Sequence, residues 1–285
     1  MKKLLPLLLL ILIGCSEPEP IDYEMLVKRD GLYYKKNTNE VYSGPVFNIN
    51  GQTSEGYIKK GKQHGKFEFY YSNGQLQEEG TFKDGKKDGT YKSYYDNGQL
   101  KLEGTYKDDI EDGSYKSYHE NGQLQEEGTF KDGKPDGPYK TYHENGQLRL
   151  EGTIKEGKED GLWKIYHENG QLQYESPYKD GEFHGPFKSY HENGQLLEEG
   201  TFKDGKENGP YKSYHENGQL QEELTHKDGK PNGPYKSYYD NGQLWSEGTY
   251  KDGIQDGPWK FYYDNGQLEY EETWKDGELI DSKEY

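Results

Sequence analysis

The stretch GSYKSYHENGQLQEEGTFKDGKPD, residues 113–136, is the unit from which most of the chain is built. A degenerate copy of its central Asn-Gly-Gln-Leu, residues 50–53, precedes the regular copies by 23 residues. A fixed period of this length is typical of a repeat architecture with diverged terminal units. The regular copies start every 24 residues, without slippage, at nine positions: Asn73, Asn97, Asn121, Asn145, Asn169, Asn193, Asn217, Asn241 and Asn265.

Within the unit, Asn121-Gly122 lies between two segments of alternating character. This pattern predicts a β-hairpin with a two-residue type I′ turn, in which both turn residues have positive φ. The polar, Gly-rich segment 131–137 then predicts a longer turn to the next hairpin. The resulting register pairs Tyr115 with Gly128, Ser117 with Glu126 and His119 with Leu124 on one face, and Lys116 with Glu127 and Tyr118 with Gln125 on the other.

Two recurring pairs support this register. The Lys116–Glu127 pair recurs in the other units except the first, where Glu68 faces Glu79, and opposite charges across a ladder are favourable. The Tyr115–Gly128 pair also recurs, and an aromatic ring over a strand glycine covers bare backbone. Its copies are Phe67–Gly80, Tyr91–Gly104, Tyr139–Gly152, Phe187–Gly200 and Tyr235–Gly248.

Composition favours the same structure. Only 29% of the 285 residues are hydrophobic, 29 are Tyr, 38 are Gly and none is Ala. Poor helix formers and abundant strand and turn formers exclude a helical bundle and disfavour a buried parallel sheet. We therefore expect an all-β fold: an elongated antiparallel meander of about ten tandem 24-residue β-hairpin repeats in a single-layer twisted sheet, preceded by a signal peptide.

The N-terminus carries a localisation signal. Lys2 and Lys3 precede the apolar run 4–13, which is too short to span a bilayer. The following Leu12-Ile13-Gly14-Cys15 resembles the lipobox of bacterial lipoproteins. This resemblance implies cleavage before Cys15, lipidation of Cys15, and anchoring in the cell envelope. Ser16 after the cysteine implies the outer membrane if the envelope is Gram-negative.

These features predict five segments along the chain. They are a lipoprotein signal peptide (1–14), the lipidated cysteine and tether (15–27), a diverged N-terminal capping region (28–64), the hairpin repeats (65–277) and a C-terminal tail (278–285).

The repeat resembles the MORN-repeat variant found in bacterial YwqK-family antitoxin proteins. The resemblance rests on Gly-x-aromatic-x-x-Tyr-x-x-Asn-Gly-Gln-Leu-x-x-Glu-Gly, and Gly31-Leu32-Tyr33-Tyr34 is similar to the usual opening of that family. It implies a β-hairpin sheet and, through the antitoxin label, neutralisation of a toxin. An exported, lipidated copy departs from the cytoplasmic location of such antitoxins.

We find no constellation that indicates catalysis, and expect no enzyme activity, cofactor or metal. Five histidines recur at one position of the unit, but neighbours two strands apart would be separated by about 9.6 Å, whereas Zn–N bonds measure about 2.0–2.1 Å. Tyr occupies the same position in other units, which favours packing. The carboxylates of turn 131–137 flank a lysine, which disfavours calcium. The histidines are His119, His143, His167, His191 and His215.

A net charge of −17 excludes a nucleic-acid binder of the usual basic kind. We expect a membrane-anchored, non-catalytic lipoprotein that acts as a protein–protein interaction scaffold. One alternative is an antitoxin or immunity protein whose partner is a toxin, and a further one is a glycan-binding or mechanical envelope spacer. The predicted binding face is a tyrosine ladder: Tyr94, Tyr118, Tyr142, Tyr166, Tyr190, Tyr214, Tyr238.

Overall fold

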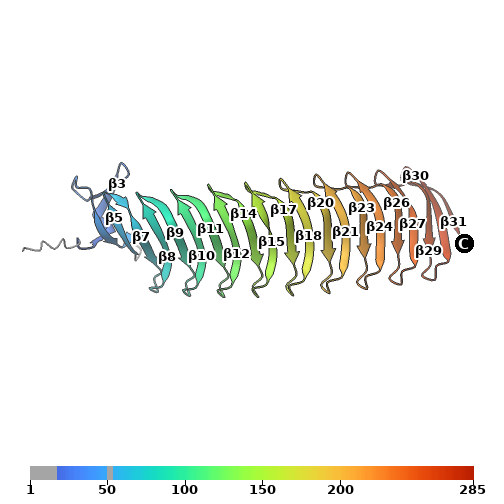
Figure 1. Ribbon diagram of the computed structural model, residues 1–285, viewed down its shortest axis with the longest axis horizontal. Helices are drawn as coiled ribbons and strands as arrows, with labels where there is room; N and C mark the ends of the chain where they lie inside the picture. Colours follow the sequence, from blue (N-terminus) through green and yellow to red (C-terminus); the bar gives the residue numbers. More distant parts are fainter. Residues whose placement is uncertain (1–17, 50–53) are drawn as a thin grey trace, which may run out of the picture. The chain divides into compact units, whose positions relative to one another are not determined.

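The computed structural model describes residues 18–49 and 54–285 (Figure 1). These residues form two compact units. The first comprises the described residues up to Gly98 together with Tyr106–Asp109, and the second comprises Gln99–Thr105 and Ile110–Tyr285. The expected all-β fold of tandem antiparallel hairpins is confirmed. Cys15 and the degenerate repeat copy at 50–53 lie outside the described residues.

In the first unit, antiparallel pairs join β4 to β5, β5 to β7, β7 to β8 and β8 to β9. β1 pairs with β4 in parallel, which departs from the expected meander, and β2 and β3 form a separate two-stranded sheet. The elements are β1 (Ile21–Asp22), the 3₁₀ helix η1 (Tyr23–Met25), β2 (Leu26–Arg29), β3 (Leu32–Lys35), β4 (Gly44–Phe47), β5 (Ser54–Lys59), β6 (Lys62–Gln63), β7 (Gly65–Tyr70), β8 (Leu76–Lys83) and β9 (Lys86–Tyr94).

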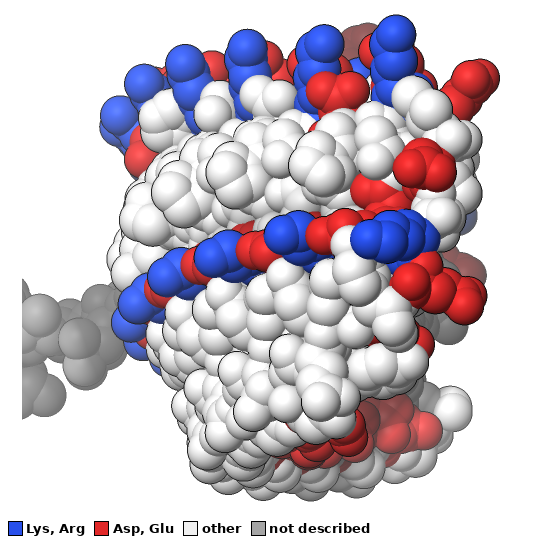
Figure 2. All heavy atoms as spheres, turned by 90° about the vertical axis from the view of Figure 1, so that its right-hand side faces the viewer, with Lys and Arg blue, Asp and Glu red and all other residues white. Residues whose placement is uncertain are grey.

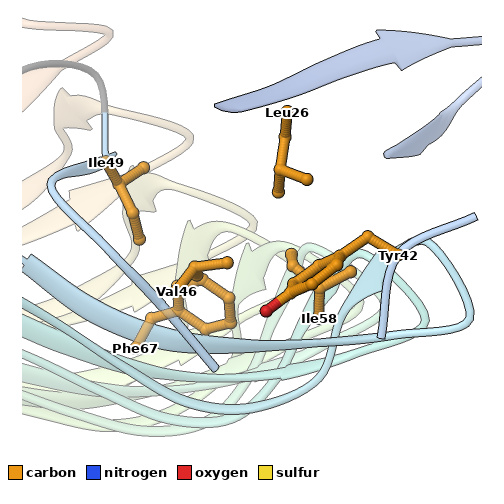
Figure 3. Packing of buried hydrophobic residues seen from close by; sticks show 6 residues of the cluster. All are labelled: Leu26, Tyr42, Val46, Ile49, Ile58 and Phe67. Atoms are coloured by element: carbon orange, nitrogen blue, oxygen red, sulfur yellow. The ribbon is translucent and has the colours of Figure 1, made fainter. Parts of the chain in front are cut away.

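The first unit encloses a compact hydrophobic cluster. Ile58 and Phe67 are fully buried, and they come from adjacent strands of its sheet. Figure 3 shows Leu26, from the segment predicted to be the tether, and Tyr42, from the diverged capping region, pointing towards them. Burying such a side chain stabilises the fold by roughly 1.5–3 kcal/mol. The diverged segment therefore supplies core residues that a regular repeat does not. The cluster comprises Leu26, Tyr42, Val46, Ile49, Ile58 and Phe67.

The second unit is built from hairpins that follow one another in chain order (Figure 1). The strand β10 (Leu100–Lys107) is divided between the two units. The others are β11 (Ile110–Tyr118), β12 (Leu124–Lys131), β13 (Lys134–Pro135), β14 (Gly137–Tyr142), β15 (Leu148–Lys155), β16 (Lys158–Glu159), β17 (Gly161–Tyr166), β18 (Leu172–Lys179), β19 (Glu182–Phe183), β20 (Gly185–Tyr190), β21 (Leu196–Lys203), β22 (Lys206–Glu207), β23 (Gly209–Tyr214), β24 (Leu220–Lys227), β25 (Lys230–Pro231), β26 (Gly233–Tyr238), β27 (Leu244–Lys251), β28 (Ile254–Gln255), β29 (Gly257–Tyr262), β30 (Leu268–Lys275) and β31 (Glu278–Glu284).

The predicted register is correct along most of each hairpin and wrong next to the turn. Tyr115 pairs with Gly128, Lys116 with Glu127 and Ser117 with Glu126, as predicted. A β-bulge then shifts the register, so that Tyr118 pairs with Leu124, and the predicted His119–Leu124 and Tyr118–Gln125 pairs do not form. Each later hairpin carries the same bulge. Bulges of this kind bend a strand and increase its twist.

The bulge accompanies a turn that differs from the predicted one. Gly122 N–H donates to the His119 carbonyl at 2.8 Å, and only Gly122, not Asn121, has positive φ. This is the pattern of a three-residue loop, a type I turn followed by a left-handed glycine. The type I′ turn lies instead at Asp132-Gly133, where both residues have positive φ and Lys131 pairs with Lys134. The segment predicted to be a longer turn is therefore the tight one.

The hydrogen bonds of the Asn side chain explain why Asn occurs in this loop. Asn145 Oδ1 accepts a hydrogen bond from Gln147 N–H at 2.9 Å, within its own turn. Asn145 Nδ2 donates to the Glu168 carbonyl, in the turn of the next repeat, at 3.0 Å. The amide therefore closes one turn and ties it to its neighbour, a role that needs no positive φ.

Replacing Asn145 by Ala should lower the free energy of unfolding by about 1–3 kcal/mol, because two hydrogen bonds of roughly 0.5–1.5 kcal/mol each are lost. Urea unfolding followed by circular dichroism measures this change. Asn145→Asp keeps the acceptor within the turn and removes the donor to Glu168, so we expect about half the loss. A full loss for the Asp variant would show that the contact between repeats dominates.

Candidate binding faces of the repeats

The predicted tyrosine ladder lies on the sheet face that also carries the Lys–Glu pairs. Tyr142 Oη donates to Glu127 of the preceding repeat at 2.8 Å, and Tyr166 Oη donates to Glu151 at 2.7 Å. The same bond recurs at 2.8–3.3 Å from Tyr94, Tyr118, Tyr190, Tyr214, Tyr238 and Tyr262. Each of the predicted binding tyrosines is half-buried and already holds a hydrogen-bond partner, so the ladder joins successive repeats.

The glutamates of this ladder also meet lysines. Lys116 Nζ lies 3.8 Å from Glu127 Oε2, and Lys140 Nζ lies 3.9 Å from Glu151 Oε2. Figure 2 shows a surface row in which basic and acidic side chains alternate, with uncharged surface on both sides. Exposed pairs of this kind contribute about 0–1 kcal/mol each. Burial, followed by the hydrogen bond and charge of Glu127, raises the pKa of Tyr142 to about 12.

In the first repeat, an additional lysine offsets the repulsion between two paired glutamates. Glu68 pairs with Glu79 across the strands, as predicted. Lys66 Nζ lies 2.7 Å from a carboxylate oxygen of each. Hydrogen bonds to both carboxylates raise the pKa of Lys66, and the Lys66 ammonium holds the pKa of Glu79 below its usual range.

The histidine ladder has a structural role. His143 Nε2 lies 3.1 Å from the Tyr166 carbonyl, and His215 Nε2 lies 2.9 Å from that of Tyr238. A carbonyl can only accept, so Nε2 carries the proton in these bonds. Tyr239 Oη donates to the equivalent carbonyl of the next repeat at 2.8 Å, which explains why Tyr and His exchange here. No group of three potential metal-ligating side chains occurs within 18–49 and 54–285.

The opposite face carries an aromatic stripe that forms the most buried part of the second unit. Trp163, Phe187 and Trp259 are 7%, 3% and 2% exposed. The ring centroid of Trp259 lies 5.2 Å from that of Tyr235 and 5.1 Å from that of Tyr250. A repeat therefore has little core of its own and is stabilised by rings of its neighbours, as expected of a repeat array.

Most glycines of this stripe are covered by a different ring from the one predicted, whereas Gly200 is covered by its predicted partner Phe187 as well as by Tyr211 of the next repeat. Gly128 pairs with Tyr115, but the ring atom that approaches the Cβ position of Gly128, at 3.3 Å, is Tyr139 Cδ2 from the next repeat. In the same way Gly248 pairs with Tyr235 but is overlaid by Trp259. Most of the cover of these glycines thus comes from packing between repeats.

Gly248→Ala should therefore destabilise the protein by about 1–3 kcal/mol, because the added methyl group meets the Trp259 indole in a filled site. Gly128→Ala is the matched control, since Tyr139 leaves more space there. Thermal unfolding compares the two variants. Equal melting temperatures for both would contradict a specific clash with Trp259.

An open groove on the same face of the second unit was missed by the sequence reasoning. It has a volume of about 850 Å³ and is lined by residues of three successive repeats. Trp245 lines it with 46% of its surface exposed, and its ring centroid lies 6.4 Å from that of Tyr239. Trp245 occupies a position at which Gln is the commonest residue, for example Gln221. Aligning the repeats position by position identifies Trp245 as an exception and so points to the groove.

The groove is acidic. Glu198 and Glu222 line it, and none of the described residues lining it is Lys or Arg. Tyr211 Oη donates to Glu198 Oε2 at 2.9 Å. Burial, with further contributions from the charge and hydrogen bond of Glu222, raises the pKa of Tyr235 to about 12. Carboxylates and aromatic rings thus line the same open groove.

The sequence of the repeat decides the family. The MORN repeat variant model matches nine consecutive segments, which together cover more than half of the chain. This chain belongs to the MORN repeat variant family. Each MORN variant match begins just before the Gly that opens a hairpin. Seven of the nine end at the Asp of an Asp-Gly turn, whereas 87–108 ends at Asp108-Asp109 and 135–156 ends at Glu156-Gly157. The matched segments are 63–84, 87–108, 111–132, 135–156, 159–180, 183–204, 207–228, 231–252 and 255–276.

The other comparisons add no functional information to this MORN variant protein. No curated protein matches it. Among solved structures it is similar to chains in the crystal structures of TcdB2-TccC3 and TcdB2-TccC3-Cdc42, at 11% and 12% identity and a TM-score of 0.20 for both. These alignments cover 87% of this chain and only 15% and 16% of those chains. Within residues 18–49 and 54–285, the structure contains no apolar helix of membrane-spanning length.

Proposed function

We propose that this MORN variant protein is a membrane-anchored, non-catalytic scaffold that binds a protein partner through its second unit. The observation that carries the proposal is the 850 Å³ groove with the exposed Trp245. Elsewhere on the repeats, the tyrosine and histidine ladders use their polar groups to join one repeat to the next. An exposed Trp beside Tyr residues is typical of the anchoring positions of protein interfaces.

The membrane anchor rests on Cys15 and its lipobox-like context. Two acyl chains suffice for stable membrane attachment, because each buried methylene contributes about 0.8 kcal/mol. Metabolic labelling with a palmitate analogue, compared between the wild type and Cys15→Ser, tests this part. An unlabelled wild-type protein, or equal membrane recovery of both forms, would refute the anchor.

Partner binding is tested by affinity purification from envelope extracts of the source cells, read by mass spectrometry. We expect one protein in a fixed ratio to the wild type, and the same protein with Cys15→Ser, because the anchor serves only for placement. Recovery of nothing specific by either form would refute the scaffold function and favour a glycan-binding or mechanical spacer.

A second candidate is an antitoxin or immunity protein, favoured by the similarity of Gly31-Leu32-Tyr33-Tyr34 and the repeat to YwqK-family antitoxins. In that case the recovered partner is toxic when expressed alone. Co-expression with this chain then restores growth. A partner that is not toxic would refute the antitoxin function and would be consistent with the scaffold function.

A further inference from the structure

The groove around Trp245 differs in charge from the equivalent place in an earlier repeat. Four repeats before Trp245 the same position holds Arg149, and four repeats before Glu222 and Tyr235 lie Glu126 and Tyr139. There the positive charge of Arg149 offsets part of the effect of Glu126 on the pKa of Tyr139. The earlier repeat therefore combines this Glu–Tyr arrangement with a guanidinium that acts on it electrostatically.

In the Trp245 groove the cation is missing and the negative charge is larger. Glu198 and Glu222 both line it, whereas the position equivalent to Glu198 four repeats earlier is Leu102. Burial raises the pKa of Tyr211, the hydrogen bond and charge of Glu198 and the charge of Glu222 raise it further, and no cation opposes them. The groove therefore presents three carboxylates, those of Glu198, Glu222 and Asp240, that an external cation can neutralise.

The aromatic rings suit the same ligand. Trp245 is exposed, and Tyr235 and Tyr239 line the same groove. A cation over a Trp or Tyr face is stabilised by about 0.5–2 kcal/mol. The planar guanidinium of arginine also stacks on such rings and forms paired hydrogen bonds with a carboxylate. Each carboxylate accepts more than the single bond that a Tyr hydroxyl provides.

We propose that this groove binds an arginine side chain of the partner protein, which takes the place that Arg149 occupies in the earlier repeat. The inference rests on the proposed partner-binding function and specifies its chemistry. An arginine-bearing segment lying across the three repeats would bring its guanidinium between Glu198, Glu222 and Trp245.

The test uses the full chain and a synthetic end-capped peptide that carries two arginines among glycines. A twin peptide replaces arginine by citrulline, which keeps the shape and removes the charge. Isothermal titration calorimetry should show binding of the arginine peptide and at least about tenfold weaker binding of the citrulline peptide, a difference of ~1.4 kcal/mol. Equal affinity for the two peptides, or no binding of the arginine peptide, would overturn the proposal.

Four variants localise the interaction. Trp245→Gln copies the residue of other repeats and should weaken arginine-peptide binding by roughly 2- to 30-fold. Trp245→Arg copies Arg149 and should abolish binding, because the groove then carries its own cation. Glu222→Gln should also weaken binding, whereas Glu126→Gln, the matched control beside Arg149, should not. An equal loss with Glu126→Gln would show attraction to the acidic chain as a whole and would overturn the site.

Affinity purification with Trp245→Arg separates this inference from the proposed function. Loss of the partner found with the wild type supports both. Retention of that partner leaves the scaffold function intact and overturns the arginine site. If the wild type recovers no partner, the scaffold function falls, and the site then stands or falls by the peptide titration.

Discussion

Replacing Trp259 by Ala should lower the free energy of unfolding by about 3–5 kcal/mol, the usual cost of removing a buried Trp. The Trp259 ring is 2% exposed, covers Gly248 and contacts Tyr235 and Tyr250. Because these three residues belong to the preceding repeat, the loss of Trp259 removes contacts between two repeats. Denaturant unfolding followed by circular dichroism measures the change.

Trp245→Ala is the control for this experiment, since Trp245 is 46% exposed. A surface substitution of this kind changes stability by about 0.5 kcal/mol or less. Hydrogen exchange should further show that protection falls first in the strands around Trp259. A similar loss of stability for both variants would contradict the assignment of the buried stripe as the core.

Stability should fall steeply between about pH 10 and pH 12. Burial and the glutamate hydrogen bonds raise the pKa of Tyr118, Tyr142 and Tyr166 to about 12, from an ordinary value of 10.0. A group whose folded pKa is raised stabilises the protein fully below its unfolded pKa, and this stabilisation is lost as the pH rises through the folded pKa. Because the ladder repeats, the losses accumulate over several tyrosines.

Phenolate absorbance and circular dichroism, recorded over the same pH range, test this prediction. The ladder tyrosines should ionise together with the loss of structure. Tyr142→Phe removes one such group and should make the remaining stability less sensitive to alkali, although it also removes the bond to Glu127. Ionisation of all tyrosines near pH 10 with the fold intact would contradict the tight ladder.

Periodicity and cross-strand chemistry were sufficient to predict the hairpins and most of their register. The Lys116–Glu127 and Tyr115–Gly128 pairs are correct because charge and ring-over-glycine complementarity both depend on direct pairing. The prediction assigned the tight turn and the longer turn to the wrong segments, because Asn-Gly and Asp-Gly have the same local preference for positive φ. One of the bonds that stabilise the loop at Asn121 reaches Glu144 in the next repeat, and a single repeat does not contain that partner.

The candidate site depends on Trp245, a residue that differs from the pattern of the other repeats. The tyrosine ladder was prominent because it recurs, yet recurrence here reflects the bonds that join the units. Trp245 occurs once at its position, and only the arrangement of three repeats places it beside Glu198 and Glu222. Neighbours along the chain do not indicate this, because these residues lie more than twenty positions apart.

The hydrogen bonds between neighbouring turns also affect how the number of repeats can change by recombination of the gene. His119 reaches Tyr142 and Asn121 reaches Glu144, and in both cases the partner lies 23 residues further along the chain. Recombination between near-identical coding units adds or deletes 24 residues at a time, so each such bond finds an equivalent partner after the event. The array can thus lengthen or shorten between generations without a new folding solution, provided that the units around Trp245 stay contiguous.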